Sequence, residues 1–112
     1  MTIDEKELEA LRELCEEVKV LTEGSYTFIF MKKLRFPCGA ESMQMNALLV
    51  PQEHTGYATR LFLERPLTNR GKSQNWQVHT ILGDTWHTWS WKEVLPGRPL
   101  MHILSDHLNA FL

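Results

Sequence analysis

The chain has 112 residues, a formal net charge of −2 and a pI of about 6.2. Its length fits a single domain over residues 1–112, and 43% hydrophobic with 23% charged residues is typical of a folded globular protein. Without an overall positive charge, neither nucleic acid nor a membrane surface is expected as a partner. No apolar run is long enough for a membrane span, and the acidic N-terminal sequence is unlike a signal peptide, so we expect a cytoplasmic protein.

The first predicted element is an amphipathic helix of about four turns that ends before Gly24. Thr2 and Glu5 fit a capping box at its start. The apolar positions that recur at helical spacing are Leu8, Leu11, Leu14, Cys15 and Val18. The opposite face is acidic and carries Glu7, Glu9, Glu13, Glu16 and Glu17. This pattern favours a solvated face, with a docking surface for a basic partner as the alternative.

A series of strands is predicted next, over residues 25–31, 43–50 and 57–64. Short connections between them favour an antiparallel meander. In the second strand, Met43, Met45, Ala47 and Leu49 are expected on one face. Residues 65–75 are polar and predict a loop. Residues 76–82 form either a fourth strand or an ordered loop.

A C-terminal helix is predicted to begin at Pro99, because proline suits the first turn of a helix. Its expected core-facing residues are Leu100, Ile103, Leu104, His107, Leu108 and Phe111. The chain therefore predicts an α+β fold, with an N-terminal helix, about four antiparallel strands and a helix packed on the sheet.

The segment 76–91 contains all four tryptophans of the chain: Trp76, Trp86, Trp89 and Trp91. Indole rings bury a large area and need a partner for their N–H groups. The favoured interpretation is a rigid aromatic cluster over the sheet. The alternative is an exposed aromatic surface that binds a protein partner.

Three residues of the same segment are candidates for acid–base chemistry: His79, Asp84 and His87. A carboxylate can orient a neighbouring imidazole, and helical or turn geometry over residues 83–87 would bring Asp84 near His87. The alternative is that Asp84 caps a turn after Gly83 and that His87 is partly buried with a backbone partner. The same histidines are the candidates for a metal site. However, the spacing of His79, His87, His102 and His107 matches no zinc motif, so neither a metal nor another cofactor is predicted.

The two cysteines, Cys15 and Cys38, form no disulfide framework. Cys15 lies on the apolar side of the predicted helix and is expected to be an inert core thiol. Cys38 lies between Pro37 and Gly39, and it is the candidate nucleophile if the turn exposes it.

The order of these elements resembles the ubiquitin-conjugating (UBC) fold. In that fold, an active-site stretch with a cysteine is followed by a Trp-Ser motif and an apolar helix. Here the corresponding stretch begins at His79, the motif is Trp89-Ser90, and the helix follows Pro99. The pattern Leu82-Gly83-x-x-Trp86-x-x-Trp89-Ser90, after Gly56-Tyr57, is similar to the divergent bacterial UBC-like proteins of prokaryotic family E.

The resemblance implies partners and a departure from the usual chemistry. Family E proteins are associated with bacterial modification systems that also contain a ubiquitin-like protein, a ThiF-type activating enzyme and a JAB-type metalloprotease. His79 stands where the family would carry its thioester cysteine, and a histidine cannot form a transferable thioester. No His-Pro-Asn tripeptide precedes it, so an asparagine for oxyanion stabilisation is missing too.

We therefore expect an atypical UBC-like protein that acts by binding within such a system, with His79 in the nucleophile's place and His87 and Asp84 nearby. Three alternatives stay open. Cys38 can serve as the acceptor thiol of an active conjugating enzyme. The histidines can bind a metal. The acidic helix or the tryptophans can form a plain interaction module.

Overall fold

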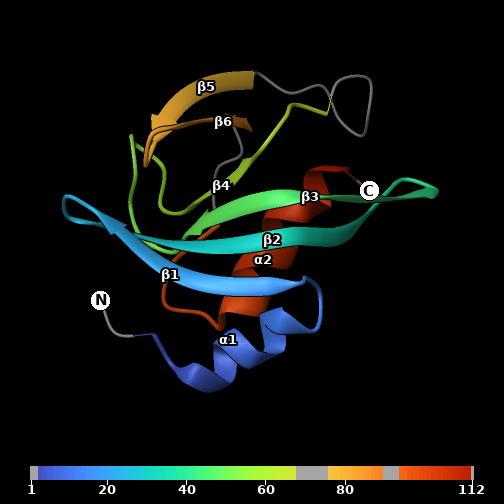
Figure 1. Cartoon of the computed structure of the whole chain (residues 1–112), viewed down its shortest axis with the longest axis horizontal. Helices are drawn as coiled ribbons and strands as arrows, with labels where there is room; N and C mark the ends of the chain where they lie inside the picture. The colour runs from blue at the N-terminus through green and yellow to red at the C-terminus, as the bar shows by residue number, and fades with distance from the viewer. Residues whose placement is uncertain (1–2, 68–75, 90–93, 112) are drawn as a thin grey trace.

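The computed structural model describes residues 3–67, 76–89 and 94–111. It has an α+β fold in which two helices cover one face of a six-stranded antiparallel sheet (Figure 1). The strand order is β1-β2-β3-β4-β6-β5. The predicted α+β class, the antiparallel sheet and the helix at each end are confirmed. The sheet has two more strands than the expected four.

Helix α1 spans Glu5–Arg12 and is much shorter than predicted. Asp4 caps it by accepting a hydrogen bond from the Lys6 N–H at 2.9 Å, whereas Thr2 lies outside the described residues. The chain then enters strand β1, Glu17–Glu23, which pairs along its whole length with β2. The predicted helix beyond residue 12 is therefore wrong. Val18 and Val20 are β-branched, and the pairing with β2 outweighs the acidic helical pattern.

Strands β2, Tyr26–Cys38, and β3, Glu41–Val50, form the long hairpin at the centre of the sheet. Strand β2 was predicted to end near residue 31, but it continues past a bulge at Lys33, where φ is +53°. Pro37 is tolerated near its end because β1 pairs only as far as Lys32, so the missing N–H of Pro37 interrupts no β1–β2 pairing. The predicted second strand is confirmed, with Met45, Ala47 and Leu49 in the helix-side core.

Strand β4 is short, spanning Arg60–Leu63, because residues 54–57 form a tight turn before it. Strands β5, Trp76–Ile81, and β6, Asp84–Trp89, form a second hairpin. This hairpin is placed so that β6 pairs with β4 and β5 becomes an edge strand. Of the two alternatives for residues 76–82, a strand or an ordered loop, the structure has the strand. Most of the predicted 65–75 loop, residues 68–75, lies outside the described part of the chain.

Helix α2 spans Leu100–Leu108 and continues into a 3₁₀ turn, η1, Asn109–Phe111. All six residues predicted to face the core are buried. With α1 they form the larger of two apolar cores, between the helices and the sheet. A smaller core lies on the opposite, outer face of the sheet and consists of Phe28, Leu48, Val50, Phe62, Ile81 and Trp86. Neither described helix has the length and apolar character that crossing a bilayer requires.

Candidate functional site

His79 lies in the middle of β5 on the outer face of the sheet, directly opposite Trp86 of β6. Its ring centroid is 5.5 Å from that of Phe62 and 5.9 Å from that of His54. The side chain is half-buried. Burial lowers the pKa of His79, and the positive charge of Arg60 lowers it further. The imidazole is therefore neutral at physiological pH.

His54 is brought to the same place by a tight turn over residues 54–57. The backbone N–H of His54 donates to the Tyr57 carbonyl at 2.9 Å, and the N–H of Tyr57 donates back to the His54 carbonyl at 3.1 Å. Thr55 and Gly56 have φ angles of +49° and +89°, as a two-residue type I′ turn requires. His54 is buried against Tyr26 and Phe62. Burial lowers its pKa, and the nearby His79 and Arg60 lower it further.

Arg60 opens β4 between these two histidines and is 2% exposed. Its Nη1 donates to the Thr55 hydroxyl, and its Nη2 donates to Gln77 Oε1 at 2.9 Å. The centre of the guanidinium lies 4.1 Å from the ring centroid of Tyr57, a cation–π distance. Burial lowers the pKa of Arg60. We call these six residues the outer-face cluster: His54, Thr55, Tyr57, Arg60, Gln77 and His79.

Asp84 and His87 do not join this cluster. His87 pairs with Val78 and Leu63, and Leu63 belongs to the helix-side core, so His87 faces the opposite side of the sheet from His79. Asp84 shares the outer face but lies at the tip of the β5–β6 hairpin, where it is exposed. Asp84 and His87 are both in a strand and point to opposite faces, so the turn that would place them side by side is absent here.

The tryptophans divide between the two cores. Trp89 packs against Phe111 and Trp76 at ring distances of 4.8 and 5.3 Å on the helix side. Trp86 lies on the outer face, with its ring 6.3 Å from that of Phe30. It also lines an open groove of about 260 Å³ together with Lys19, Leu21, Phe30, Leu48, Leu82 and Asp84. Trp91 and Ser90 lie outside the described residues.

Both cysteines are buried. Cys38 ends β2 with 1% of its surface exposed, and the neighbouring Gly39 N–H donates to the Phe111 carbonyl at 2.9 Å. Cys15 is 9% exposed, and its thiol donates to the Leu11 carbonyl at 3.2 Å. Burial raises the pKa of Cys15. The expected exposure of Cys38 in a turn is therefore not found, because β2 continues through this residue.

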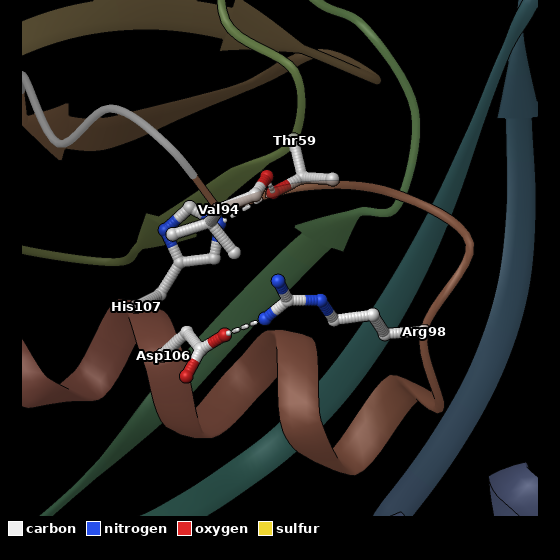
Figure 2. Close-up of polar contacts among 5 residues, drawn as sticks. All are labelled: Thr59, Val94, Arg98, Asp106 and His107. Atoms are coloured by element: carbon white, nitrogen blue, oxygen red, sulfur yellow. Dashed lines mark hydrogen bonds and ion pairs between the residues drawn. The ribbon is translucent and has the colours of Figure 1, made fainter.

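His107 makes a polar contact with Thr59 inside the helix-side core (Figure 2). The Thr59 hydroxyl donates to the Val94 carbonyl at 2.7 Å, so its oxygen accepts from His107 Nε2 at 2.9 Å. This arrangement assigns the proton of the neutral ring to Nε2. Burial, with a smaller contribution from Arg60, lowers the pKa of His107 to about 3. On the adjacent exposed side of α2, Arg98 forms an ion pair with Asp106 at 3.1 Å.

The histidines do not assemble a metal site in the part of the chain that the structure describes, where no three His, Cys, Asp or Glu side chains converge. His102 is exposed on α2, and His107 is on the other side of the sheet from His79. Sequence reasoning found His79 but missed His54 and Arg60. The alternation of Ala58, Arg60 and Phe62 on one strand face was the available signal, because it places a charge beside an aromatic side chain.

Comparisons with known proteins add no further assignment: no family model, curated protein or solved structure matches this chain.

Proposed function

We propose that this chain is an atypical UBC-like protein that acts by binding within a bacterial ubiquitin-like modification system, without thioester chemistry. One observation carries the proposal. Both thiols are buried, whereas the residue in the nucleophile's place, His79, is half-exposed on an edge strand. That the system is a ubiquitin-like modification system is inferred from the resemblance of the sequence motifs to prokaryotic family E.

The burial of the thiols supports a role without thioester transfer. A conjugating enzyme needs a thiolate that a large acyl donor can reach, and thiolates form most readily in exposed, electropositive surroundings. Cys38 is only 1% exposed. The next residue, Gly39, is hydrogen-bonded to the carbonyl of Phe111 in the C-terminal 3₁₀ turn. Cys15 is on the helix side beneath α1, and its raised pKa disfavours the thiolate.

The outer-face groove beside Trp86 is the surface we propose for partner binding. Its apolar lining comes from β1, β2, β3 and the β5–β6 hairpin, and a single charge of each sign, Lys19 and Asp84, flanks it. An apolar centre surrounded by a polar rim is the usual composition of a protein–protein interface. Trp76 and Trp89 pack against Phe111 on the helix side, so Trp86 is the tryptophan that we assign to this surface.

The test is a binding titration of the isotope-labelled chain with the system's ubiquitin-like protein, followed by NMR. We expect chemical-shift changes centred on the groove. Leu21→Arg should weaken binding at least about tenfold, because it places a charge in an apolar interface. Val20→Arg is the matched control, since Val20 is the neighbouring residue of β1, points to the other face and is 42% exposed. It should leave the affinity unchanged.

The same titration distinguishes the groove from the alternative binding surface, the acidic face around α1. Reversing the charges at Glu9, Glu13 and Glu16 should leave the affinity unchanged if the groove is the binding site. Loss of binding in this variant, with the Leu21→Arg variant unaffected, would assign the partner to the acidic face around α1 and would refute the groove.

A further inference from the structure

The outer-face cluster contains a buried positive charge with no negative charge to balance it. Among the described residues, the ion pairs are Arg12–Glu5, Lys19–Glu17, Lys33–Glu16 and Arg98–Asp106, and all of these lie at the surface. Arg60 is 2% exposed and has no carboxylate of the described residues within ion-pair distance. A buried charge without a counter-charge is strongly destabilising, so its retention needs a physical reason.

The hydrogen bonds of the guanidinium leave donors unused. A guanidinium has five N–H donors. Two of them reach neutral acceptors, the Thr55 hydroxyl and Gln77 Oε1. The buried Nε–H finds no acceptor among the described residues. The Nε–H and an adjacent Nη proton form the planar fork that matches two oxygens of a carboxylate or phosphate.

The surroundings of Arg60 are also suited to an anion. Two imidazoles lie beside Arg60: the rings of His54 and His79 both pack on Phe62 at 5.5 Å, and His54 Nδ1 is within 3.2 Å of the Thr55 hydroxyl. The Tyr57 ring lies 4.1 Å from the centre of the guanidinium and stabilises its charge by a cation–π contact, which uses none of the N–H donors. Tyr57 and His79 are both half-buried, so each of these two side chains of the cluster is partly accessible to solvent.

We propose that Arg60 anchors a binding site for one oxyanion, a carboxylate or phosphate group, which enters between Tyr57 and His79. The Nε–H edge of Arg60 would bind two oxygens of the anion, and the imidazole of His79 would donate a third hydrogen bond. The anion supplies the missing counter-charge and the missing acceptor together. This site is separate from the groove beside Trp86, and the inference does not rest on the proposed function.

The direct test follows the arginine Nε–H resonances of the isotope-labelled full chain by NMR. Sodium acetate and sodium phosphate are the two probes, each titrated against sodium chloride at constant ionic strength. We expect a saturable shift of the Arg60 resonance. Arg12 and Arg98 are internal controls, because both are exposed and already paired with carboxylates. Saturation with acetate assigns a carboxylate site, and saturation with phosphate assigns a phosphate site.

Two outcomes would overturn the inference: no shift of Arg60 with either anion, or linear shifts of equal size for all three arginines. Because wild-type protein is used, this test does not depend on a variant that folds.

Variants then assign the contacts. Arg60→Lys keeps the charge but removes the planar fork, and it should weaken anion binding at least about tenfold. Because Arg60 is buried, a second variant, His79→Gln, tests the site at a half-exposed position and should weaken binding severalfold. His87→Gln is its control on the opposite face of the same hairpin and should bind as the wild type does. Equal affinity in all four proteins would refute the site.

Discussion

At the scale of single residues, the buried His107 couples folding to pH. Its neutral ring is fixed between Thr59 and the sheet, and its pKa is lowered from 6.5 to about 3. In the unfolded chain the same ring takes up a proton near pH 6.5. Below that pH the unfolded state binds more protons than the folded state, so stability is lost as the pH falls from 6.5 towards 3.

We therefore predict that the free energy of unfolding decreases with acidification, with His107 contributing a slope of up to about 1.4 kcal/mol per pH unit. The lowered pKa values of His54 and His79 add to the decrease with the same sign. Urea unfolding between pH 8 and pH 4.5 measures this slope. His107→Gln keeps a donor for Thr59 and should flatten it, whereas His102→Gln, at an exposed position, should not. An unchanged slope in His107→Gln would contradict this account.

A second prediction at this scale concerns thiol reactivity. In the native protein at neutral pH, iodoacetamide should label Cys38 at least about 100-fold more slowly than in urea, because labelling requires opening of the structure. Mass spectrometry of the labelled peptides distinguishes Cys38 from Cys15. Native labelling of Cys38 as fast as in urea would show an accessible thiol and revive a catalytic role for it.

At the scale of elements, a side chain of α1 completes the start of α2. Pro99 is the N-cap residue of α2 and supplies no side-chain hydrogen bond. Instead, Glu7 Oε1 accepts a hydrogen bond from the Leu100 N–H at 2.7 Å. A carboxylate at a helix N-terminus satisfies a backbone donor and interacts favourably with the helix dipole. The contact therefore links the first and last helices of the chain.

We predict that Glu7→Ala lowers the free energy of unfolding by about 0.5–2 kcal/mol, the usual contribution of an N-terminal cap. Glu9→Ala is the matched control, because Glu9 is exposed on the same helix. It should change stability by no more than about 0.5 kcal/mol. Equal effects of the two substitutions in thermal or urea unfolding would show that the interhelix cap contributes nothing.

The elements also show where sequence patterns succeed. Helix α2 was predictable because its apolar residues repeat at helical spacing and its buried residues lie on one face of the helix only. Strand β1 was not, because Leu14, Cys15 and Val18 extend the helical pattern of α1 into residues that pair with β2. Strand β6 was missed because pairing with β4, distant in sequence, determines its course.

The candidate site was predictable only in part. His79 stood out through its place in the motif order, and the structure puts it at a half-exposed position. Its neighbours His54 and Arg60 come from a turn and from another strand. Only the register of the sheet brings them within contact of β5. A one-residue difference in register would have placed His79 on the other face.

At the scale of the whole molecule, the C-terminal turn after α2 packs against both hairpins of the sheet, β2–β3 and β5–β6 (the course of the chain is seen in Figure 1). Phe111 is fully buried and stacks on Trp76 of β5, with 6.2 Å between the ring centroids. It also packs at a tilt against Trp89 of β6 and Phe36 of β2. Its carbonyl also accepts from Gly39 at the tip of the β2–β3 hairpin. A single residue therefore contacts two hairpins, β2–β3 and β5–β6, that are far apart in the sequence.

We predict that Phe111→Ala lowers the free energy of unfolding by about 3–5 kcal/mol, the cost of removing a large core side chain. Since single domains are stable by only about 5–15 kcal/mol, this variant should be close to unfolding. Val78→Ala, at a 63% exposed position of β5, should change stability by less than about 0.5 kcal/mol. A loss of less than about 1 kcal/mol in Phe111→Ala would show that the C-terminal turn contributes little to the fold.

The proposed function requires that the chain binds its partners without forming a thioester. The most direct measurement mixes the chain with the system's ubiquitin-like protein, its ThiF-type activating enzyme and ATP, and compares non-reducing with reducing gels while binding is measured in parallel. We predict a stable complex and no thiol-sensitive adduct. An adduct that reducing agent releases, and that Cys38→Ala abolishes, would contradict the claim and make this chain a conjugating enzyme.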